Sequence, residues 1–193
     1  MSTGRAPGAE GRGPPDFITM SAIFGIMHHE GAPVARAELD RMAAVLAHCG
    51  PDGASVWHDR AVGLGHRMLH TTPESLQETL PWADPAADVA ITADARLDNR
   101  DELRAALGIA DAGISDSRLI LAAYLAWGED GLARLDGDFA FAIWDGRRQQ
   151  LFCARDRFGL RAFYYAAGPR AFIFASEIKG VLAAGVPDAP NDA

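Results

Sequence analysis

The stretch Met20-Ser21-Ala22-Ile23-Phe24-Gly25-Ile26 carries the most information about the fold. Within it begins a short apolar run, residues 23–27, which predicts a buried strand. Residues 1–16 are dominated by Gly, Pro, Ala, Arg and Ser, a composition that cannot bury enough apolar surface to order itself. We therefore expect residues 1–19 to be a disordered extension, or a start assigned too early, and the folded domain to begin at residue 20.

Four helices are expected after this strand. Leu39, Met42, Ala43 and Leu46 recur at three- and four-residue spacing, which predicts an amphipathic helix. The other helices run from a cap at Asn99 to Leu107, from a cap at Ser115 or Asp116 with Leu119, Ile120, Ala123 and Tyr124 on the inner face, and over residues 177–183.

The remaining apolar runs are typical of strands. Single strands are predicted at 55–58, 62–67 and 89–93, and two hairpins pair 139–144 with 151–154 and 163–166 with 172–175. Strands that arrive as hairpins, rather than singly between helices, favour antiparallel sheets flanked by helices. The fold class expected is therefore α+β.

Length and charge restrict the function. A chain of 193 residues with 49% hydrophobic content should form one domain with tails, which leaves no room for a second catalytic domain. The net charge of −8 argues against nucleic acid and against an anionic membrane surface as partners. No apolar run approaches the roughly 20 residues of a membrane helix, and no signal peptide is apparent, so we expect a cytoplasmic protein.

The cysteines and the chain end add little. Cys49 and Cys153 lack the spacing of a metal-ligand pair, so neither a disulfide framework nor a metal site is expected. Residues 185–193 contain two prolines among small and acidic residues, which is typical of a tail or a truncated linker. Asp98 and Asp101, together with Arg96, Arg100 and Arg104, predict a solvated helix start of mixed charge.

Residues 20–26 resemble the Met-Cys-Gly-Ile-Phe-Gly-Ile opening of class II glutamine amidotransferase domains. His-Cys-Gly-Pro-Asp at 48–52 is similar to the His-Arg-Gly-Pro-Asp of that family. Further similar motifs follow in the family's order at 63–67, 115–116, 137–142, 154–156 with Gly159, and 174–179. The style is that of the N-terminal half of asparagine synthetases and their relatives, which include β-lactam synthetases and lasso-peptide cyclases.

This resemblance covers residues 20–184, nearly all of the chain expected to fold. It implies the four-layer αββα sandwich of N-terminal-nucleophile hydrolases, with antiparallel sheets. It also implies that Ser21 stands where the family has its nucleophilic cysteine. In the family the initiator Met is removed, so the free α-amine of that cysteine acts as the base. Ser21 has such an amine only if the mature chain begins there, and a hydroxyl without a base is a poor nucleophile.

The same resemblance places the glutamine-binding positions at Cys49, Asp94, Ala95, Arg96 and Asp116. Cys49 replaces the family's carboxylate-binding Arg, and Asp94-Ala95-Arg96 replaces an Asn-Gly-Glu triplet that supplies the oxyanion hole and an ammonium partner. An anionic Asp94 would repel an oxyanion, and Arg96 would repel the glutamine ammonium. Among these positions Asp116 alone keeps the family residue.

These changes favour a degenerate amidotransferase-like domain that has lost glutaminase activity. Residues 94–100 look like the version found in lasso-peptide-cyclase-type proteins. The domain would serve as scaffold or partner of an ATP-dependent amide-forming synthetase, either separately encoded or missing from this chain. No cofactor is expected on this chain, since ATP and Mg²⁺ belong to the synthetase domain.

Two alternatives stay open. In one, the chain is an active glutaminase of the asparagine synthase type, which uses Ser21 as an N-terminal nucleophile with its own amine as base. In the other, the altered pocket binds a precursor peptide rather than an amino acid. Ammonia release from glutamine separates the first alternative from the rest, and capture of a peptide or neighbouring gene product supports the second.

Overall fold

The computed structural model describes residues 20–185. The expectations for residues 1–19 and for the tail beyond Gly185 lie outside the described residues. Strands, α-helices and two 3₁₀ helices follow in this order: β1 (Ala22–His28), α1 (Arg36–Val45), β2 (Gly53–Asp59), β3 (Val62–Met68), η1 (Glu74–Gln77), β4 (Trp82–Asp84), β5 (Val89–Leu97), α2 (Arg100–Leu107), α3 (Asp116–Trp127), η2 (Gly128–Arg134), β6 (Gly137–Asp145), β7 (Gln150–Arg155), β8 (Tyr164–Ala167), β9 (Ala171–Ala175) and α4 (Ile178–Ala183).

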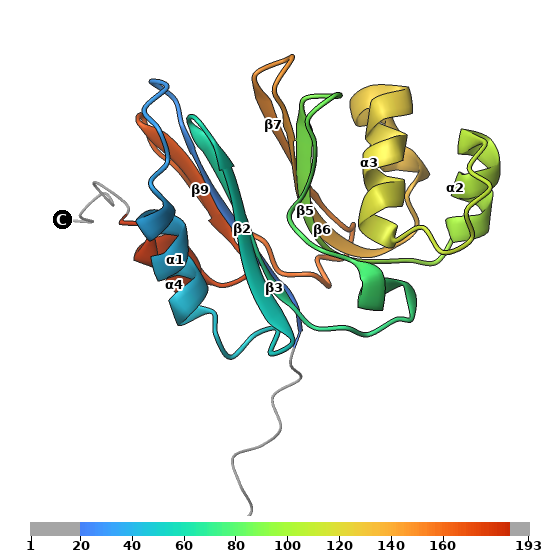
Figure 1. Cartoon of the computed structure of the whole chain (residues 1–193), viewed down its shortest axis with the longest axis horizontal. Helices are drawn as coiled ribbons and strands as arrows, with labels where there is room; N and C mark the ends of the chain where they lie inside the picture. Colours follow the sequence, from blue (N-terminus) through green and yellow to red (C-terminus); the bar gives the residue numbers. More distant parts are fainter. Residues whose placement is uncertain (1–19, 186–193) are drawn as a thin grey trace, which may run out of the picture.

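Two antiparallel sheets form the middle of the molecule. The first has the strand order β2-β3-β1-β9-β8, and the second has the order β4-β5-β6-β7. Helices α1 and α4 cover the outer face of the first sheet, and α2 and α3 lie outside the second (Figure 1). This arrangement confirms the expected α+β class and its four layers of helix, sheet, sheet and helix.

Strand β1 is apolar because it is buried on both faces. Ala22, Phe24 and Ile26 pack on the side of α1 and α4, while Ile23 packs between the two sheets. A strand covered on both faces has no need of alternating polar residues, which explains the continuous apolar run. Its pairing with β3 and β9 places Ser21, the residue just before β1, close to the end of β3.

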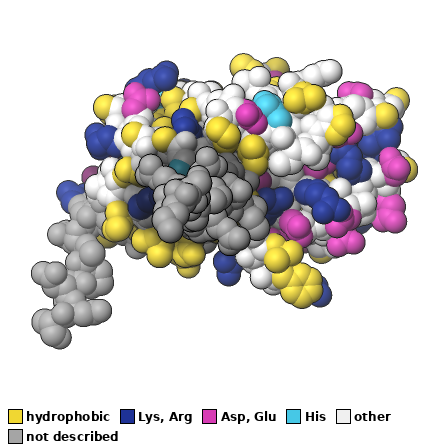
Figure 2. Space-filling view, turned by 90° about the horizontal axis from the view of Figure 1, so that it is seen from below, with side chains coloured by type: hydrophobic (Ala, Val, Ile, Leu, Met, Phe, Trp, Pro, Cys, Tyr) yellow, Lys and Arg dark blue, Asp and Glu magenta, His cyan; other side chains and the backbone are white. Residues whose placement is uncertain are grey.

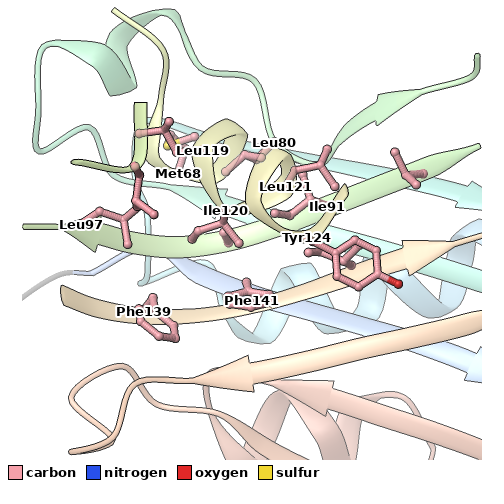
Figure 3. Close-up of a cluster of buried hydrophobic side chains, with 14 residues drawn as sticks. Met68, Leu80, Ile91, Leu97, Leu119, Ile120, Leu121, Tyr124, Phe139 and Phe141 are labelled. Carbon is pink, nitrogen blue, oxygen red and sulfur yellow. The ribbon is translucent and has the colours of Figure 1, made fainter. Parts of the chain in front are cut away.

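The largest apolar cluster lies between the second sheet and its helices (Figure 3). Leu119, Ile120 and Tyr124 of α3 contribute to it from above the sheet, and Ile91 of β5 and Phe141 of β6 contribute from the sheet itself. The predicted inner face of this helix is therefore confirmed. The cluster fixes the start of α3, and with it Asp116, beside β5.

The two sheets approach each other through small side chains. Ala90, Ala140 and Ala142 of the second sheet meet a layer that includes Leu64 and Phe174 of the first. A direct bond also joins the sheets, because Thr92 Oγ1 in β5 donates to the carbonyl of Gly65 in β3 at 3.1 Å.

Several boundaries differ from those predicted. β5 continues to Leu97 instead of ending at residue 93, because it stays paired with β6 down to Gly137. Strand β4 and the two 3₁₀ helices were not predicted, and β8 begins at residue 164 rather than 163. The extension of β5 matters for the site, since it places Asp94, Ala95 and Arg96 on a strand.

The surface in Figure 2 carries acidic and basic side chains intermixed on its right-hand side, where α2 and α3 lie. Two ion pairs lie in and just before α2: Arg104 with Asp101, and Arg96 with Asp98. No helix between residues 20 and 185 has the length and apolar character that crossing a membrane demands.

Candidate functional site

Ser21 lies at the entrance to β1 and is held by the chain that follows β3. Its Oγ accepts a hydrogen bond from the backbone N–H of Leu69 at 3.0 Å and faces the Leu69 carbonyl at 3.3 Å. Among residues 20–185 these are the hydroxyl's hydrogen-bond partners, and neither is a base. The nitrogen of Ser21 is part of a peptide bond to Met20, so in this chain it is not an amine that can take a proton.

Met20 is itself part of the structure. Its carbonyl accepts a hydrogen bond from the Gly50 N–H at 3.0 Å, and its sulfur lies 3.6 Å from Nη1 of Arg161. Gly50 has a φ of +53°, and a Cβ at that position would overlap the backbone of Arg67. Because residue 50 is a glycine, its backbone can lie against the backbone of Arg67. In this position its N–H reaches the carbonyl of Met20, the residue before Ser21.

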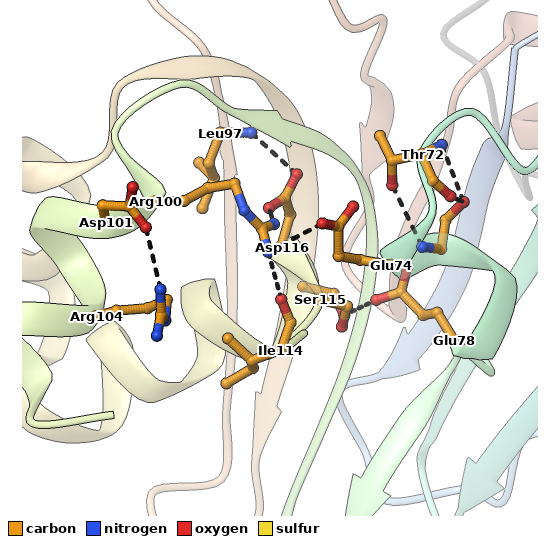
Figure 4. A network of polar contacts seen from close by, with 12 residues as sticks. Thr72, Glu74, Glu78, Leu97, Arg100, Asp101, Arg104, Ile114, Ser115 and Asp116 are labelled. Atoms are coloured by element: carbon orange, nitrogen blue, oxygen red, sulfur yellow. Dashed lines mark hydrogen bonds and ion pairs between the residues drawn. The ribbon is translucent and has the colours of Figure 1, made fainter. Parts of the chain in front are cut away.

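Asp116 is engaged by an arginine of its own chain (Figure 4). Nη1 of Arg100 donates to Asp116 Oδ1, while the N–H of Leu97 donates to Oδ2 at 3.1 Å. Arg100 also donates to the carbonyl of Ile114 at 2.6 Å and lies 4.0 Å from Glu74. Burial raises the pKa of Asp116 above its ordinary value, even though the Leu97 N–H and Arg100 oppose the shift.

Asp94 is also paired with an arginine, Arg161, which comes from the loop after β7. Its Oδ1 lies 3.5 Å from Nη1 of Arg161, and the two side chains are 11% and 19% exposed. Burial raises the pKa of Asp94 to about 6, and the nearby Arg161 cation limits the rise. Asp94 and Asp116, the two aspartates that line the pocket, are therefore each paired with an arginine of the chain.

The loop between β7 and β8 positions Arg161 through Asp156. The Asp156 carboxylate accepts hydrogen bonds from the backbone N–H groups of Phe158, Leu160 and Arg161, each at 3.0 Å. Burial alone would raise the pKa of Asp156, yet these N–H groups hold it below its ordinary value. A charged, fully bonded Asp156 fixes the loop and so aims Arg161 at Asp94.

His66 lies between the sheets beside the pocket. It is 1% exposed, and its Nδ1 is 3.3 Å from the hydroxyl of Thr92, while among the described residues its Nε2 has no partner. Burial, followed by the influence of His70, lowers the pKa of His66 to about 3. The ring is therefore neutral near pH 7, and no hydrogen bond joins it to the Ser21 hydroxyl.

The space at Ser21 is small. The pocket has a free volume of about 30 Å³, enough for about two water molecules at most, whereas ligand clefts usually offer about 300 Å³ or more. Its lining combines the end of β3, the segment through η1, the middle of β5 and the start of α3: Ser21, His66, Met68, Leu69, Thr71, Thr72, Glu74, Ser75, Glu78, Ala93, Asp94, Ala95, Ser115 and Asp116.

The structure brings four of the six predicted site residues together and separates the other two. Ser21, Asp94, Ala95 and Asp116 line this pocket. Arg96 instead is 62% exposed at the end of β5 and pairs with Asp98 at 2.7 Å. Cys49 instead lies with His48 and with Glu177, the residue before α4, and does not line the pocket.

Two arginines of the site were missed from the sequence. Arg100 was expected to belong to a solvated helix start, and that expectation is wrong, since Arg100 is 22% exposed and turned toward Asp116. Arg161 was not singled out. Its partner lies 67 positions earlier in the chain (161 − 94), so no local pattern links them. The signal in the sequence was the pair of aspartates, Asp94 and Asp116, at predicted pocket positions. A buried carboxylate is costly unless it is paired, so each predicts a cation nearby.

The glutamine amidotransferase domain model matches residues 20–192 of this chain. The chain belongs to the glutamine amidotransferase domain family. Sequence relatives place this amidotransferase domain with the asparagine synthetases. It is 36% identical over 149 residues to asparagine synthetase [glutamine-hydrolyzing] 3 of Bacillus subtilis, a match that covers 75% of this chain and 24% of that protein.

Two other relatives show the same partial coverage. A putative asparagine synthetase of Methanocaldococcus jannaschii is 30% identical, over 85% of this chain and 35% of its own length. The amidase chry2 of Gibberella zeae is 33% identical, over 86% of this chain and 26% of its own length. The amidotransferase domain thus spans about a quarter to a third of these three relatives.

Solved structures agree on the fold. The glutamine phosphoribosylpyrophosphate amidotransferase of B. subtilis superposes with a TM-score of 0.65 at 18% identity, over 85% of this chain and 43% of that one. The allosteric regulatory enzyme of purine biosynthesis gives a TM-score of 0.66, also at 18% identity, with the same coverage of both chains. At this identity the likeness concerns the fold of the amidotransferase domain.

Proposed function

We propose that this chain is an asparagine-synthetase-type amidotransferase domain without glutaminase activity, which acts as the scaffold half of an ATP-dependent amide-forming synthetase. The observation that carries the proposal is the pairing of the two pocket aspartates with arginines. Asp116 is already bonded to Arg100, and Asp94 lies against Arg161. A glutamine ammonium would have to displace a guanidinium from Asp116, and a developing oxyanion would meet Asp94.

The chemistry at Ser21 supports the same conclusion. Its hydroxyl is bonded to the backbone of Leu69, and none of the pocket's titratable groups is hydrogen-bonded to it. A serine needs a base within about 3 Å to attack an amide at neutral pH. A free volume of about 30 Å³ also leaves no space for a glutamine side chain.

The partner assigned by this proposal is a synthetase domain of the lasso-peptide-cyclase kind, on a separate chain or in another part of a longer protein. Such a domain activates a carboxylate with ATP and Mg²⁺, and an amine already present in the substrate attacks it, so that free ammonia is unnecessary. The relatives support the presence of such a partner domain, because the matched part makes up only 24–35% of the length of the three described above.

Ammonia release from glutamine tests the proposal. The protein is produced from Met20, its N-terminus is checked by mass spectrometry, and it is assayed with Ser21→Ala and Ser21→Cys variants. We expect no release above the Ser21→Ala background from the wild type or from Ser21→Cys, because the pocket remains filled by its own ion pairs. Circular dichroism confirms that each variant is folded.

Glutamine-dependent release by a protein that begins at Ser21, lost in Ser21→Ala, would overturn the proposal. It would establish the alternative in which Ser21 is an N-terminal nucleophile. Release by Ser21→Cys alone would show that the nucleophile is the sole defect and that the paired carboxylates do not block glutamine.

A second candidate function, precursor-peptide binding, is favoured by a larger cavity next to the pocket. This cavity has a volume of about 320 Å³ between η1 and α3, and Glu74, Glu78 and Asp111 line it together with Trp82 and Arg118. The three carboxylates fit a cationic side chain or amine. Fluorescence anisotropy with a lysine-containing peptide, compared between wild type and Glu78→Gln, distinguishes this function from a scaffold that binds no peptide.

A further inference from the structure

A second cluster of reactive side chains lies away from the pocket, at the junction of two segments. His48 and Cys49 follow α1, and Glu177 directly precedes α4, which packs beside α1 (Figure 1). One nitrogen, one sulfur and one oxygen of these residues lie within 4.8 Å of one another. Adjacent His and Cys do not have the spacing of a metal-ligand pair, and Glu177 is 128 positions from Cys49 (177 − 49), so the sequence alone predicts no metal here.

The three distances describe one face of a tetrahedron. Nε2 of His48 lies 3.3 Å from Sγ of Cys49, Sγ lies 3.4 Å from Oε1 of Glu177, and Nε2 lies 2.8 Å from Oε1. A four-coordinate zinc ion with usual bond lengths separates nitrogen or oxygen from sulfur by about 3.5 Å, and nitrogen from oxygen by about 3.3 Å. Two edges already match within about 0.2 Å, and the third must open by about 0.5 Å.

The ammonium group of Lys179 already contacts two of the three residues in this cluster. Nζ of Lys179 lies 2.9 Å from Oε2 of Glu177 and 3.1 Å from Nε2 of His48. The lysine side chain is 48% exposed, so it can swing into solvent when another cation takes its place. The cluster therefore attracts positive charge, and Lys179 competes for it.

The surroundings of the Cys49 thiol do not suit a nucleophile. Its Sγ faces the Glu177 carboxylate, 3.4 Å from Oε1. A reactive thiolate is found instead in an electropositive site. Metal coordination is the chemistry that this combination of thiol, imidazole and carboxylate fits, because sulfur, nitrogen and oxygen together are the donor set of zinc.

We propose that His48, Cys49 and Glu177 bind a divalent cation of the zinc type. On binding, the thiol proton leaves for solvent, a metal–sulfur bond forms, and Lys179 withdraws. Water completes the fourth position. The ion links the segment after α1 to the start of α4. It also stiffens the turn at Gly50, whose N–H holds Met20. This inference is independent of whether Ser21 is active.

The test is a Co²⁺ titration of the full chain, followed by the thiolate-to-cobalt charge-transfer absorption and then by displacement with Zn²⁺. We expect one equivalent to give this band. Cys49→Ser should abolish it, and Cys153→Ser, which changes the other cysteine, should retain it. Glu177→Gln should weaken binding by at least about tenfold, since even outer partners of metal ligands are worth that much.

Lys179→Ala provides the decisive control. Removal of a competing positive charge beside the ion should tighten Co²⁺ binding by about fivefold or more, while loss of a merely structural lysine would leave it unchanged. A folded wild type without the charge-transfer band, a band that persists in Cys49→Ser, or an affinity unaffected by Lys179→Ala would each overturn the proposal.

Discussion

The carboxylate of Asp94 sits in a place that favours its protonated form. Its side chain is 11% exposed, and one guanidinium at 3.5 Å does not fully replace the lost water. The folded protein therefore holds a proton on Asp94 more tightly than the unfolded chain does. Stability contributed by this proton is complete below pH 3.8 and is lost as the pH rises through about 6.

Asp94→Asn should remove this pH dependence. Between pH 4 and pH 7 the variant should gain up to roughly 3 kcal/mol of unfolding free energy relative to wild type. The prediction concerns this change with pH, so a constant offset from the altered neighbour of Arg161 does not affect it. Urea unfolding of both proteins at several pH values measures the difference, and parallel curves for the two would contradict the raised pKa of Asp94.

For single residues, the sequence indicated which residue types lie at the pocket, but it did not indicate which side chains form ion pairs with them. The resemblance assigned Ser21, Asp94 and Asp116 to one site by their motif positions, and the structure brings the three side chains to one pocket. Arg100 and Arg161 became visible only in the structure, since the groups that turn them inward come from α3 and from the loop after β7. Cys49 was assigned to the pocket by motif position, although the chain there turns toward α4.

Among the elements, β3 contains two glycines at positions where a side chain has no room. Gly63 and Gly65 face the α1 side, where a Cβ on Gly65 would overlap the ring of Phe24 and one on Gly63 would press on Leu39 and Val34. The intervening Leu64 packs between the sheets. The glycines leave room on this face for the Phe24 ring and for the side chains of Leu39 and Val34, while the backbone pairing of β1 with β3 brings Ser21 to Leu69.

Gly65→Ala should destabilise the domain by about 1–3 kcal/mol or more, because the Phe24 ring is fully buried and has nowhere to move. Gly53→Ala in β2 is the matched control, since its nearest neighbour would be the Cβ of Met68 at 4.0 Å. The control should stay within about 0.5 kcal/mol of wild type. Equal unfolding free energies for the two variants, measured in urea, would show that β3 tolerates the added methyl.

The elements most accurately predicted were those with a strong apolar pattern, such as β1, β6 and α3. Strand β5 was cut short because Asp94 and Arg96 break that pattern, although backbone pairing with β6 continues past them. Strand β4 has three residues, too few for any periodicity. Both misses arise where hydrogen bonds between strands, rather than burial, decide the structure.

On the surface of the whole molecule, the exposed apolar side chains indicate where another protein surface could bind. Phe158 is 84% exposed and Leu160 is 59% exposed in the loop that also carries Arg161. The next strand, β8, is the edge of the first sheet, and its Tyr165 is 65% exposed. Apolar groups exposed in this loop and on this edge strand fit contact with another protein surface.

Under the proposed function, this surface contacts the synthetase domain. Co-expression with an asparagine-synthetase-type ATP-dependent domain should yield a complex, and Phe158→Ser with Leu160→Ser should weaken it by about tenfold or more. Leu76→Ser, which changes a side chain that is 68% exposed in η1, is the control and should have no effect. A complex weakened equally by the control would place the interface elsewhere.

The contacts of Met20 are lost if proteolysis removes this residue from the N-terminal side of the domain. A protease that stops before Met20 leaves its carbonyl on Gly50 and its sulfur beside Arg161. A protease that removes one residue more exposes the amine of Ser21, and the same cut takes away both of these interactions. Maturation of Ser21 and retention of this anchor are thus mutually exclusive outcomes of a single cleavage.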